Sequence, residues 1–269
     1  MPADALEPTG PPKDLRDVTQ RLTNLSGNLF AGFEDGVLHH HIVSNDRQLP
    51  ESYAEAVRNM PAPSPGLQAI GLIVGNGMVE TADQMLPLPI VMCDRDPVVL
   101  STLQASEVAM IEADSPAEFT DALQQHADSL TPYVPESGPI NITTQYGNQK
   151  TTWNSKGSTI PRHFLTDQEW YDSAREGMGP RAYRKVDLTD EEQVAELGDD
   201  LRGVDGEIVL ANFTNMLDHL HGRLEIPATI GRFLRLLPFS PEAVIVSSDN
   251  NRAMLTRVDP LRYWGRNAE

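Results

Sequence analysis

The residues of this sequence that are best suited to binding chemistry are two glycines and an acid. Gly75-Asn76-Gly77 directly follows the apolar run at 67–74, and Asp94 ends a second apolar run. A glycine after a strand lets the backbone approach a ligand closely. An acid ending the next strand can accept hydrogen bonds from both ribose hydroxyls of an adenosine. Their separation is close to the ~20 residues expected of such a pair, so the pattern predicts a nucleotide-type cofactor.

The same segment disfavours the dinucleotide cofactors. The fingerprint G-x-G-x-x-G requires a third glycine where this chain has Glu80. A carboxylate at that position repels a pyrophosphate, which argues against NAD and the flavins. S-adenosyl-L-methionine (S-adenosylmethionine) fits better, because it carries a sulfonium and an amino acid in place of phosphates. We therefore expect this cofactor.

With these features, the sequence from about 67 to 261 resembles the class I, Rossmann-fold S-adenosylmethionine-dependent methyltransferases. The matching pieces are LIVGNG (72–77), IVMCDRDP (90–97), YRKVDLTD (183–190) and GEIVLANFTNMLDHL (206–220). The chain departs from the family pattern at two positions: Ile73 stands where an acid is usual, and Val79 where a small residue is usual. The stretch between the second and third matching strands is also longer than usual.

The resemblance implies a role for each matching residue. Gly75 and Gly77 would contact the amino-acid part of the cofactor, with Asn76 between them. Asp94 would hold the ribose. Asp187, the acid after the third strand, would contact the adenine amino group, with Leu188 beside it.

The loop after the fourth strand would face the substrate, which points to the segment from Asn212 to Asn215. Side-chain amides there can orient an amine, amide or carboxylate near the sulfonium, and Asn212 also borders the cofactor. Asp218 and His219 follow within about a turn. His219 is a candidate general base because its ordinary pKa suits neutral pH. The alternative interpretations are a helix cap for Asn212 and a polar helix surface for His219.

The position of the third strand is open in the sequence. The run 107–114 can also be read as a strand, which would make Asp114 the adenine contact. We favour Asp187, because its strand and the following helix lead directly into the fourth strand. For either acid, the alternative role is a helix N-cap.

Three other motifs in the sequence offer alternative chemistry. Tyr146 and Lys150 have the spacing of the short-chain dehydrogenase pair, but they precede the fourth strand and enclose helix-breaking residues. The histidines at 39–41 are adjacent, so their side chains diverge and do not close easily on one metal ion. Cys93 is most simply a small core residue. We therefore predict no metal site.

The predicted fold is α/β: a Rossmann-like, mostly parallel sheet with flanking helices, an N-terminal helical cap and a C-terminal antiparallel hairpin. Nearly continuous apolar runs indicate parallel strands covered on both faces. The expected strands are 67–74, 90–93, 183–188, 207–211, 243–247 and 253–258. The expected helices are 15–25, 52–60, one from about 97, 115–130, 166–178, 189–201 and 226–237, two of them opened by capping boxes at Ser115 and Thr189.

The expected domain organisation has three parts. Residues 1–13 are Pro-rich and predict a disordered tail. Residues 14–66 form the cap and end in a Pro-rich connector, and residues 67–269 form the cofactor-binding domain. A long insertion at about 98–182 is expected to help shape the pocket, and its polar part at 131–161 is expected to be mobile.

Charge and composition restrict the partners. The net charge of -18 repels phosphate backbones, so we expect no nucleic-acid partner. No run of roughly 18 apolar residues exists, so no membrane span is expected. One cysteine and no secretory signal suit the cytoplasm. A homodimer is left open.

Three functions follow. The first is methyl transfer from S-adenosylmethionine to a small polar molecule, which needs alignment and desolvation more than a catalytic triad. The second keeps the cofactor but changes the reaction to aminocarboxypropyl transfer or cyclisation. The third is a non-catalytic Rossmann-like binding module.

Overall fold

Helices and strands alternate along the chain, as the sequence predicts for an α/β protein. The structure is a computed structural model that describes residues 55–56, 58–74, 88–130, 167–177, 179–213, 225–249 and 252–258. Its elements, in chain order, are β1 (Gln68–Val74), β2 (Ile90–Asp94), α3 (Pro97–Glu112), α4 (Pro116–Leu130), α6 (Gln168–Gly177), β3 (Arg181–Lys185), α7 (Glu191–Gly203), β4 (Gly206–Asn212), α9 (Glu225–Leu236), β5 (Phe239–Asp249) and β6 (Arg252–Arg257).

The strands form one mixed sheet with the order β3-β2-β1-β4-β5-β6. The strands from β3 to β5 in this order pair in parallel, and β6 pairs with β5 in the antiparallel direction. An α/β protein with a mostly parallel sheet is therefore confirmed. The parallel strands all end at one edge of the sheet, which we call the carboxyl edge.

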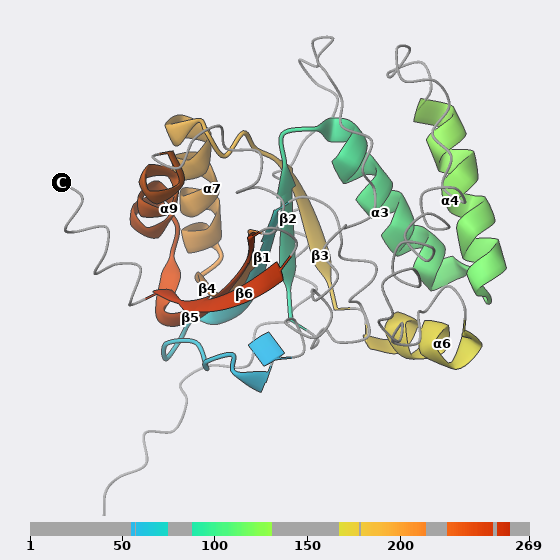
Figure 1. Cartoon of the computed structure of the whole chain (residues 1–269), viewed down its shortest axis with the longest axis horizontal. Helices are drawn as coiled ribbons and strands as arrows, with labels where there is room; N and C mark the ends of the chain where they lie inside the picture. Colours follow the sequence, from blue (N-terminus) through green and yellow to red (C-terminus); the bar gives the residue numbers. More distant parts are fainter. Residues whose placement is uncertain are drawn as a thin grey trace, which may run out of the picture.

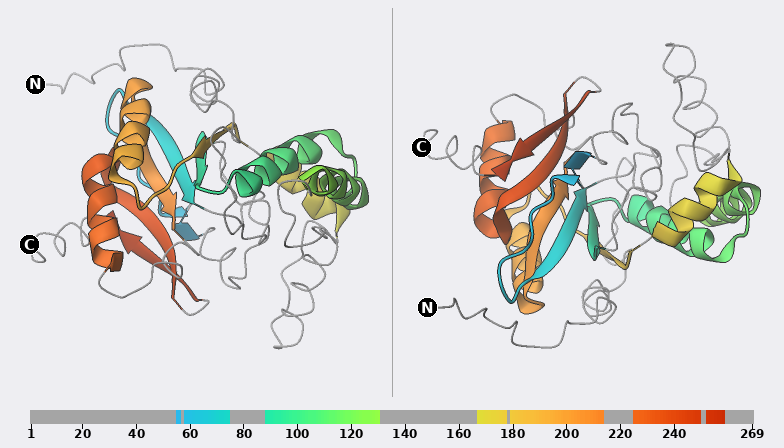
Figure 2. Two further views of the ribbon diagram at one scale, coloured as in Figure 1. Left: turned by 90° about the horizontal axis from the view of Figure 1, so that it is seen from above. Right: turned by 90° about the horizontal axis from the view of Figure 1, so that it is seen from below.

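The core lies in two layers, one on each face of the sheet. On one face, α7 and α9 contribute Leu197, Leu201 and Phe233, all fully buried. On the other face, α3 contributes Leu100 and Leu103. Figures 1 and 2 show these helices on opposite sides of the strands. Because both faces are covered, the central strands must be apolar on both sides, which explains their continuous apolar runs.

The helices α7 and α9 approach each other closely at Gly198. A Cβ atom at this position would overlap the carbonyl oxygen of Leu236. Only glycine leaves room for the backbone of α9 there. Gly198 therefore sets the distance between the two helices that cover this face.

The helix α3 begins where the sequence predicts and ends at Glu112. Asp96 is its N-cap, accepting the Val98 N–H at 2.8 Å, and Pro97 occupies the first turn. Residues 107–112 belong to this helix, so the alternative strand at 107–114 is wrong. The run misled because Val108 and Ile111 are apolar yet remain exposed.

The N-cap of helix α7 lies one residue later than the predicted N-cap, Thr189. Asp190 is the N-cap, and its carboxylate accepts the N–H groups of Glu192 and Gln193. The Gln193 side chain also donates, to the other carboxylate oxygen of Asp190, at 2.9 Å. The N-cap is therefore corrected from Thr189 to Asp190. The reciprocal bond of a capping box is not made, because the Asp190 N–H donates to the Asp187 carbonyl oxygen at 3.0 Å.

The helices α4 and α6 lie beyond α3, away from the sheet (Figures 1 and 2). The predicted cap of α4 is present, because the Glu118 N–H donates to the Ser115 hydroxyl. Phe119 of α4 packs edge-on against Tyr171 of α6, with ring centroids 6.0 Å apart. These helices thus form a second small layer that is supported by α3.

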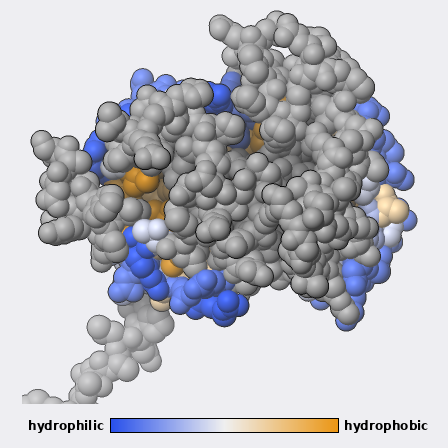
Figure 3. All heavy atoms as spheres, in the orientation of Figure 1, coloured by the Kyte–Doolittle hydropathy of each residue, from blue (hydrophilic) through white to orange (hydrophobic). Residues whose placement is uncertain are grey.

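The described part of the surface in Figure 3 is mostly hydrophilic, with apolar side chains visible only in small areas. Among the described residues, no helix combines the length and apolar character that a membrane span requires.

Candidate functional site

Three of the predicted site residues lie at the carboxyl edge of the sheet. Asp94 is the last residue of β2 and pairs with Lys185 at the end of β3. Asp187 follows β3 by two residues, and Asn212 ends β4, where it pairs with Ile73 of β1. The parallel register therefore brings side chains that are distant in sequence to one edge.

Asp94 is a partly buried carboxylate held by the backbone around it. Its Oδ1 accepts the Asp96 N–H at 2.8 Å, and its carbonyl oxygen accepts the Val186 N–H at 2.9 Å. Burial raises the pKa of Asp94 to about 6, although the backbone N–H groups of Asp96 and Arg95 act in the opposite direction. Loss of hydration thus outweighs the hydrogen bonds that the protein supplies. A ligand that donates hydrogen bonds would favour the charged form.

The loop 187–190 is shaped by its own side chains. Oδ1 of Asp187 accepts both the backbone N–H of Thr189 at 2.9 Å and its hydroxyl at 2.6 Å. The Asp187 N–H donates to Oε1 of Gln193 at 2.9 Å, and the Leu188 side chain is buried. A short loop with this many internal bonds is ordered before any ligand binds.

Arg232 and Gln193 are residues near this edge that the sequence analysis missed. Arg232 of α9 donates from Nη1 to the Thr189 carbonyl oxygen at 2.8 Å, and its Nε lies 3.7 Å from a carboxylate oxygen of Glu191. The three-residue spacing from the true N-cap to Gln193 was a usable signal. Arg232 had none, because its partner lies 43 residues away along the chain.

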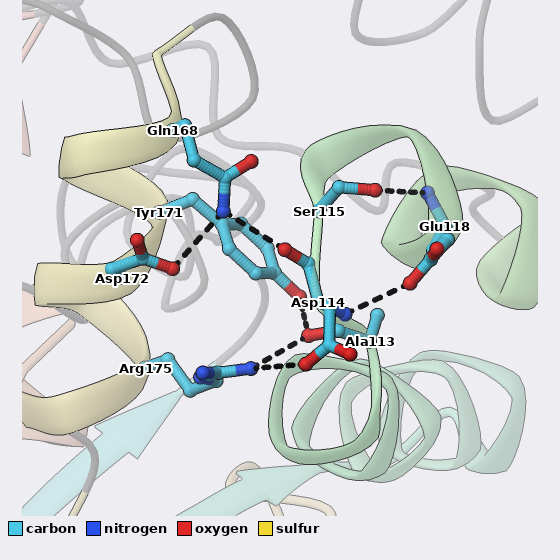
Figure 4. Close-up of polar contacts among 8 residues, drawn as sticks. All are labelled: Ala113, Asp114, Ser115, Glu118, Gln168, Tyr171, Asp172 and Arg175. Atoms are coloured by element: carbon cyan, nitrogen blue, oxygen red, sulfur yellow. Dashed lines mark hydrogen bonds and ion pairs between the residues drawn. The ribbon is translucent and has the colours of Figure 1, made fainter.

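Asp114 lies elsewhere, in the turn between α3 and α4 (Figure 4). Oδ1 of Asp114 pairs with Arg175 of α6 at 3.2 Å, and its carbonyl oxygen accepts from Gln168 at 2.9 Å. Tyr171 and Arg175 both donate to the carbonyl oxygen of Ala113. Asp114 therefore helps to join α6 to this turn and does not end a strand. Of the two acids, only Asp187 follows a strand that pairs with β2.

Asn212 is fully buried at the end of a strand whose seven residues are all buried. The next residue, Phe213, packs against Phe233 and Phe239, with ring centroids 5.2 and 6.3 Å away. These rings fix the chain as it leaves β4. The Asn212 side chain is thus held by a rigid support.

Cys93 belongs to the core, as predicted. Its side chain is 1% exposed and lies in the layer beneath α7 and α9. Burial raises the pKa of the thiol to about 12, so it stays protonated at neutral pH. It is therefore unsuited to act as a nucleophile.

Other candidate residues from the sequence lie outside the described residues. They include the first motif, the predicted catalytic residues and the weaker alternatives: Gly75, Asn76, Gly77, Asn215, His219, the histidines at 39–41, Tyr146 and Lys150. Most of the predicted cap and the polar segment at 131–161 also lie outside.

Comparison with known proteins gives no family assignment: no protein-family model matches the chain, and no curated protein is significantly similar to it. Within the described part, no group of three or more histidine, cysteine or acidic residues is arranged to hold a metal ion.

Proposed function

We propose that this protein binds S-adenosylmethionine at the carboxyl edge of its sheet and transfers a methyl group to a small polar molecule. The observation that carries the proposal is the carboxylate of Asp94, which ends β2 in a partly buried position. It is held beside the backbone that leads into the loop 187–190.

The strand order supports a ligand site at this edge. The strand order β3-β2-β1-β4-β5 supports the proposed Rossmann-like arrangement, because the direction of progression reverses between β1 and β4. In open α/β sheets, ligands bind outside the carboxyl ends of the strands at such a reversal. Asp94 and Asn212 end the strands on either side of β1, so both border this point.

The donor and acceptor character of the edge suits this cofactor. Ribose hydroxyls and the adenine amino group donate hydrogen bonds, and the carboxylates of Asp94 and Asp187 accept them. Neither acid is suited to a phosphate, whose charge they would repel. The positive sulfonium, by contrast, is compatible with an acidic edge.

Bound S-adenosylmethionine would supply an electrophilic methyl group on its sulfonium. In this proposal, Asp94 holds the ribose, and Asp187 with Leu188 contacts the adenine. The buried amide of Asn212 adds no charge to this edge, and Phe213 fixes the chain there by packing against Phe233 and Phe239. Asn215 and His219 would face the substrate, with His219 accepting a proton from it where one must leave.

Calorimetry with S-adenosylmethionine tests the cofactor. We expect the wild-type chain to bind, Asp94→Ala to bind more weakly, and the matched control Asp114→Ala to bind as the wild type does. Asp114 is also an acid, but it lies in the α3–α4 turn. If the wild-type chain does not bind at millimolar cofactor, the proposal fails and a non-catalytic binding module is favoured.

Product analysis tests the reaction. Incubation with a panel of small amines, amides and carboxylates should yield S-adenosylhomocysteine together with a methylated product. Methylthioadenosine as the product would instead indicate aminocarboxypropyl transfer or cyclisation, and methyl transfer would be rejected.

A further inference from the structure

The loop 187–190 is braced by two helices that are separate in sequence. From α7, Gln193 accepts the Asp187 N–H and donates to Asp190, at 2.9 Å in both cases. From α9, Arg232 donates to the Thr189 carbonyl oxygen at 2.8 Å. The first brace is part of a helix cap, whereas the second joins the loop to a distant helix. The hydrogen bond from Arg232 to Thr189 is therefore not needed to cap either helix.

Arg232 is an unusual residue for its place on α9. Its side chain is 23% exposed, and its neighbour Phe233 is fully buried in the core. Its ionic partner Glu191 is 63% exposed and 3.7 Å away, so this pair is weakened by solvent. The bond to the Thr189 carbonyl oxygen is the shorter contact and has a defined direction. Arg232 therefore acts on the loop mainly through Thr189.

Thr189 passes this restraint to Asp187. Its N–H and its hydroxyl both donate to Oδ1 of Asp187, at 2.9 and 2.6 Å. Wherever Arg232 holds Thr189, the Asp187 carboxylate is held as well. Three residues thus form one continuous chain of hydrogen bonds from α9 to the loop.

The loop starts beside Asp94, because the Val186 N–H donates to the Asp94 carbonyl oxygen at 2.9 Å. If Asp94 holds the ribose, as in the proposed function, the base attached to that ribose can reach the loop. The Asp187 carboxylate then accepts a hydrogen bond from the 6-amino group of adenine. A base with an oxygen at this position offers an acceptor, which the carboxylate repels.

We infer that Arg232 is a positioning residue for base recognition, holding Asp187 through Thr189 so that the site selects a 6-amino purine. This inference rests on the proposed function and goes beyond it by assigning the base selectivity to a residue of α9. Arg232 itself does not touch the cofactor in this scheme.

The test compares the affinities for S-adenosylmethionine and S-inosylmethionine, in which an oxygen replaces the 6-amino group. Arg232→Met keeps the apolar stem and removes the donors, and Thr189→Val removes only the hydroxyl. We expect each variant to lower the preference for the adenine form by about three- to tenfold, the scale of one hydrogen bond. Arg235→Met, on an exposed position of the same helix, is the matched control and should keep the full preference.

The outcomes separate the inference from the proposed function. If the wild-type chain prefers the adenine form and both variants keep that preference, the inference is wrong and the proposed function stands. If the wild-type chain binds both forms equally, the loop does not select the base and the inference is also wrong. If it binds neither form, both fail. Should Arg232→Met not fold, Arg232→Gln takes its place, because Thr189→Val keeps the carbonyl oxygen that Arg232 contacts. Thermal melting is the check on folding.

Discussion

Two acidic side chains lie at opposite ends of the parallel strands, one at the amino edge of the sheet and one at the carboxyl edge, and their surroundings differ. Glu207, at the amino end of β4, is 6% exposed, and its carboxylate accepts both the N–H and the hydroxyl of Ser64, at 2.6 and 2.9 Å. Asp94, at the carboxyl end of β2, accepts the Asp96 N–H, yet burial still raises its pKa to about 6.

The comparison separates a structural acid from a candidate functional one. Ser64 lies 143 residues before Glu207, in the Pro-rich connector 61–66, so their contact fastens the connector to the sheet. For the Asp94 carboxylate, the hydrogen bonds from the protein stabilise the charged form less than the loss of hydration destabilises it. A ligand with hydroxyl donors would offset that loss. The amino edge therefore uses its acid for folding, and the carboxyl edge keeps an acid suited to binding.

The largest expected effect is at Asp94. We predict that Asp94→Ala weakens S-adenosylmethionine binding by about 1–3 kcal/mol, the scale for leaving hydrogen-bonding groups unmatched. The melting temperature should not fall, because the substitution removes a charge that is poorly hydrated in the folded state. Calorimetry and thermal melting on one preparation check both parts. Unchanged affinity in a folded variant would remove Asp94 from the site.

Glu207 should show the opposite behaviour. We predict that Glu207→Gln lowers the free energy of unfolding by about 1–2 kcal/mol, because an amide nitrogen replaces one of the two carboxylate oxygens that accept hydrogen bonds from Ser64. Cofactor affinity should stay the same, since the residue lies at the other edge. Glu196→Gln, on the exposed face of α7, is the control for the loss of one charge. If Glu207→Gln kept its stability and bound the cofactor more weakly, Glu207 would be a binding acid and not a structural one.

The pH dependence gives a third contrast. The folded-state pKa of Asp94, about 6, lies above its ordinary value of 3.8. Between these pH values the folded chain binds more protons than the unfolded chain, so this group's contribution to stability falls as the pH rises and is constant above the window. We expect a loss of roughly 1 kcal/mol for a partly buried group. Cofactor affinity should change the other way and increase as the pH rises through 6.

Asp94→Asn isolates this effect, because the variant keeps the shape and cannot titrate. Urea unfolding of both chains from pH 4 to 7 should show the falling contribution in the wild type alone. The subtraction cancels the other acids, including Asp190, whose lowered pKa acts in the opposite direction. Parallel slopes for the two chains would contradict the assignment.

The sequence was most informative where the local pattern decides the structure. The apolar runs of the central strands predict a covered parallel sheet, and Asp96 with Pro97 marks the start of α3. The sequence predicts the N-cap of α7 at Thr189, whereas the structure has it at Asp190, because the two adjacent residues are both good N-caps. Such errors are small, since competing caps differ by one position.

The sequence was least informative where distant contacts decide. Residues 107–114 carry an apolar pattern that fits a strand, but residues 107–112 continue a helix already fixed by its N-cap. Nothing near Arg232 or Glu207 indicates their partners, which lie 43 and 143 residues away. Both contacts depend on the packing of elements that only the tertiary structure brings together.

The smallest expected effect concerns the hydrogen bonds between Ser64 and Glu207. Ser64→Ala removes the hydroxyl but keeps the backbone N–H, so it deletes one of the two bonds to the carboxylate. We predict that it lowers the free energy of unfolding by about 0.5–1 kcal/mol. Ser64 is exposed, so water can replace part of the lost interaction. Its effect should therefore be smaller than that of Glu207→Gln.

A double-mutant cycle decides whether the two residues act on each other. If the hydroxyl bond is the link, Ser64→Ala should cost little once Glu207→Gln is present, leaving a coupling energy of about 0.5 kcal/mol or more. The cycle is measured by urea unfolding of the four chains, with Glu196→Gln replacing Glu207→Gln in a second cycle that should show no coupling. Additive effects in the first cycle would mean that the Ser64 hydroxyl does not contribute to the contact. The backbone N–H of Ser64 would then be the only one of the two donors that holds the connector to Glu207.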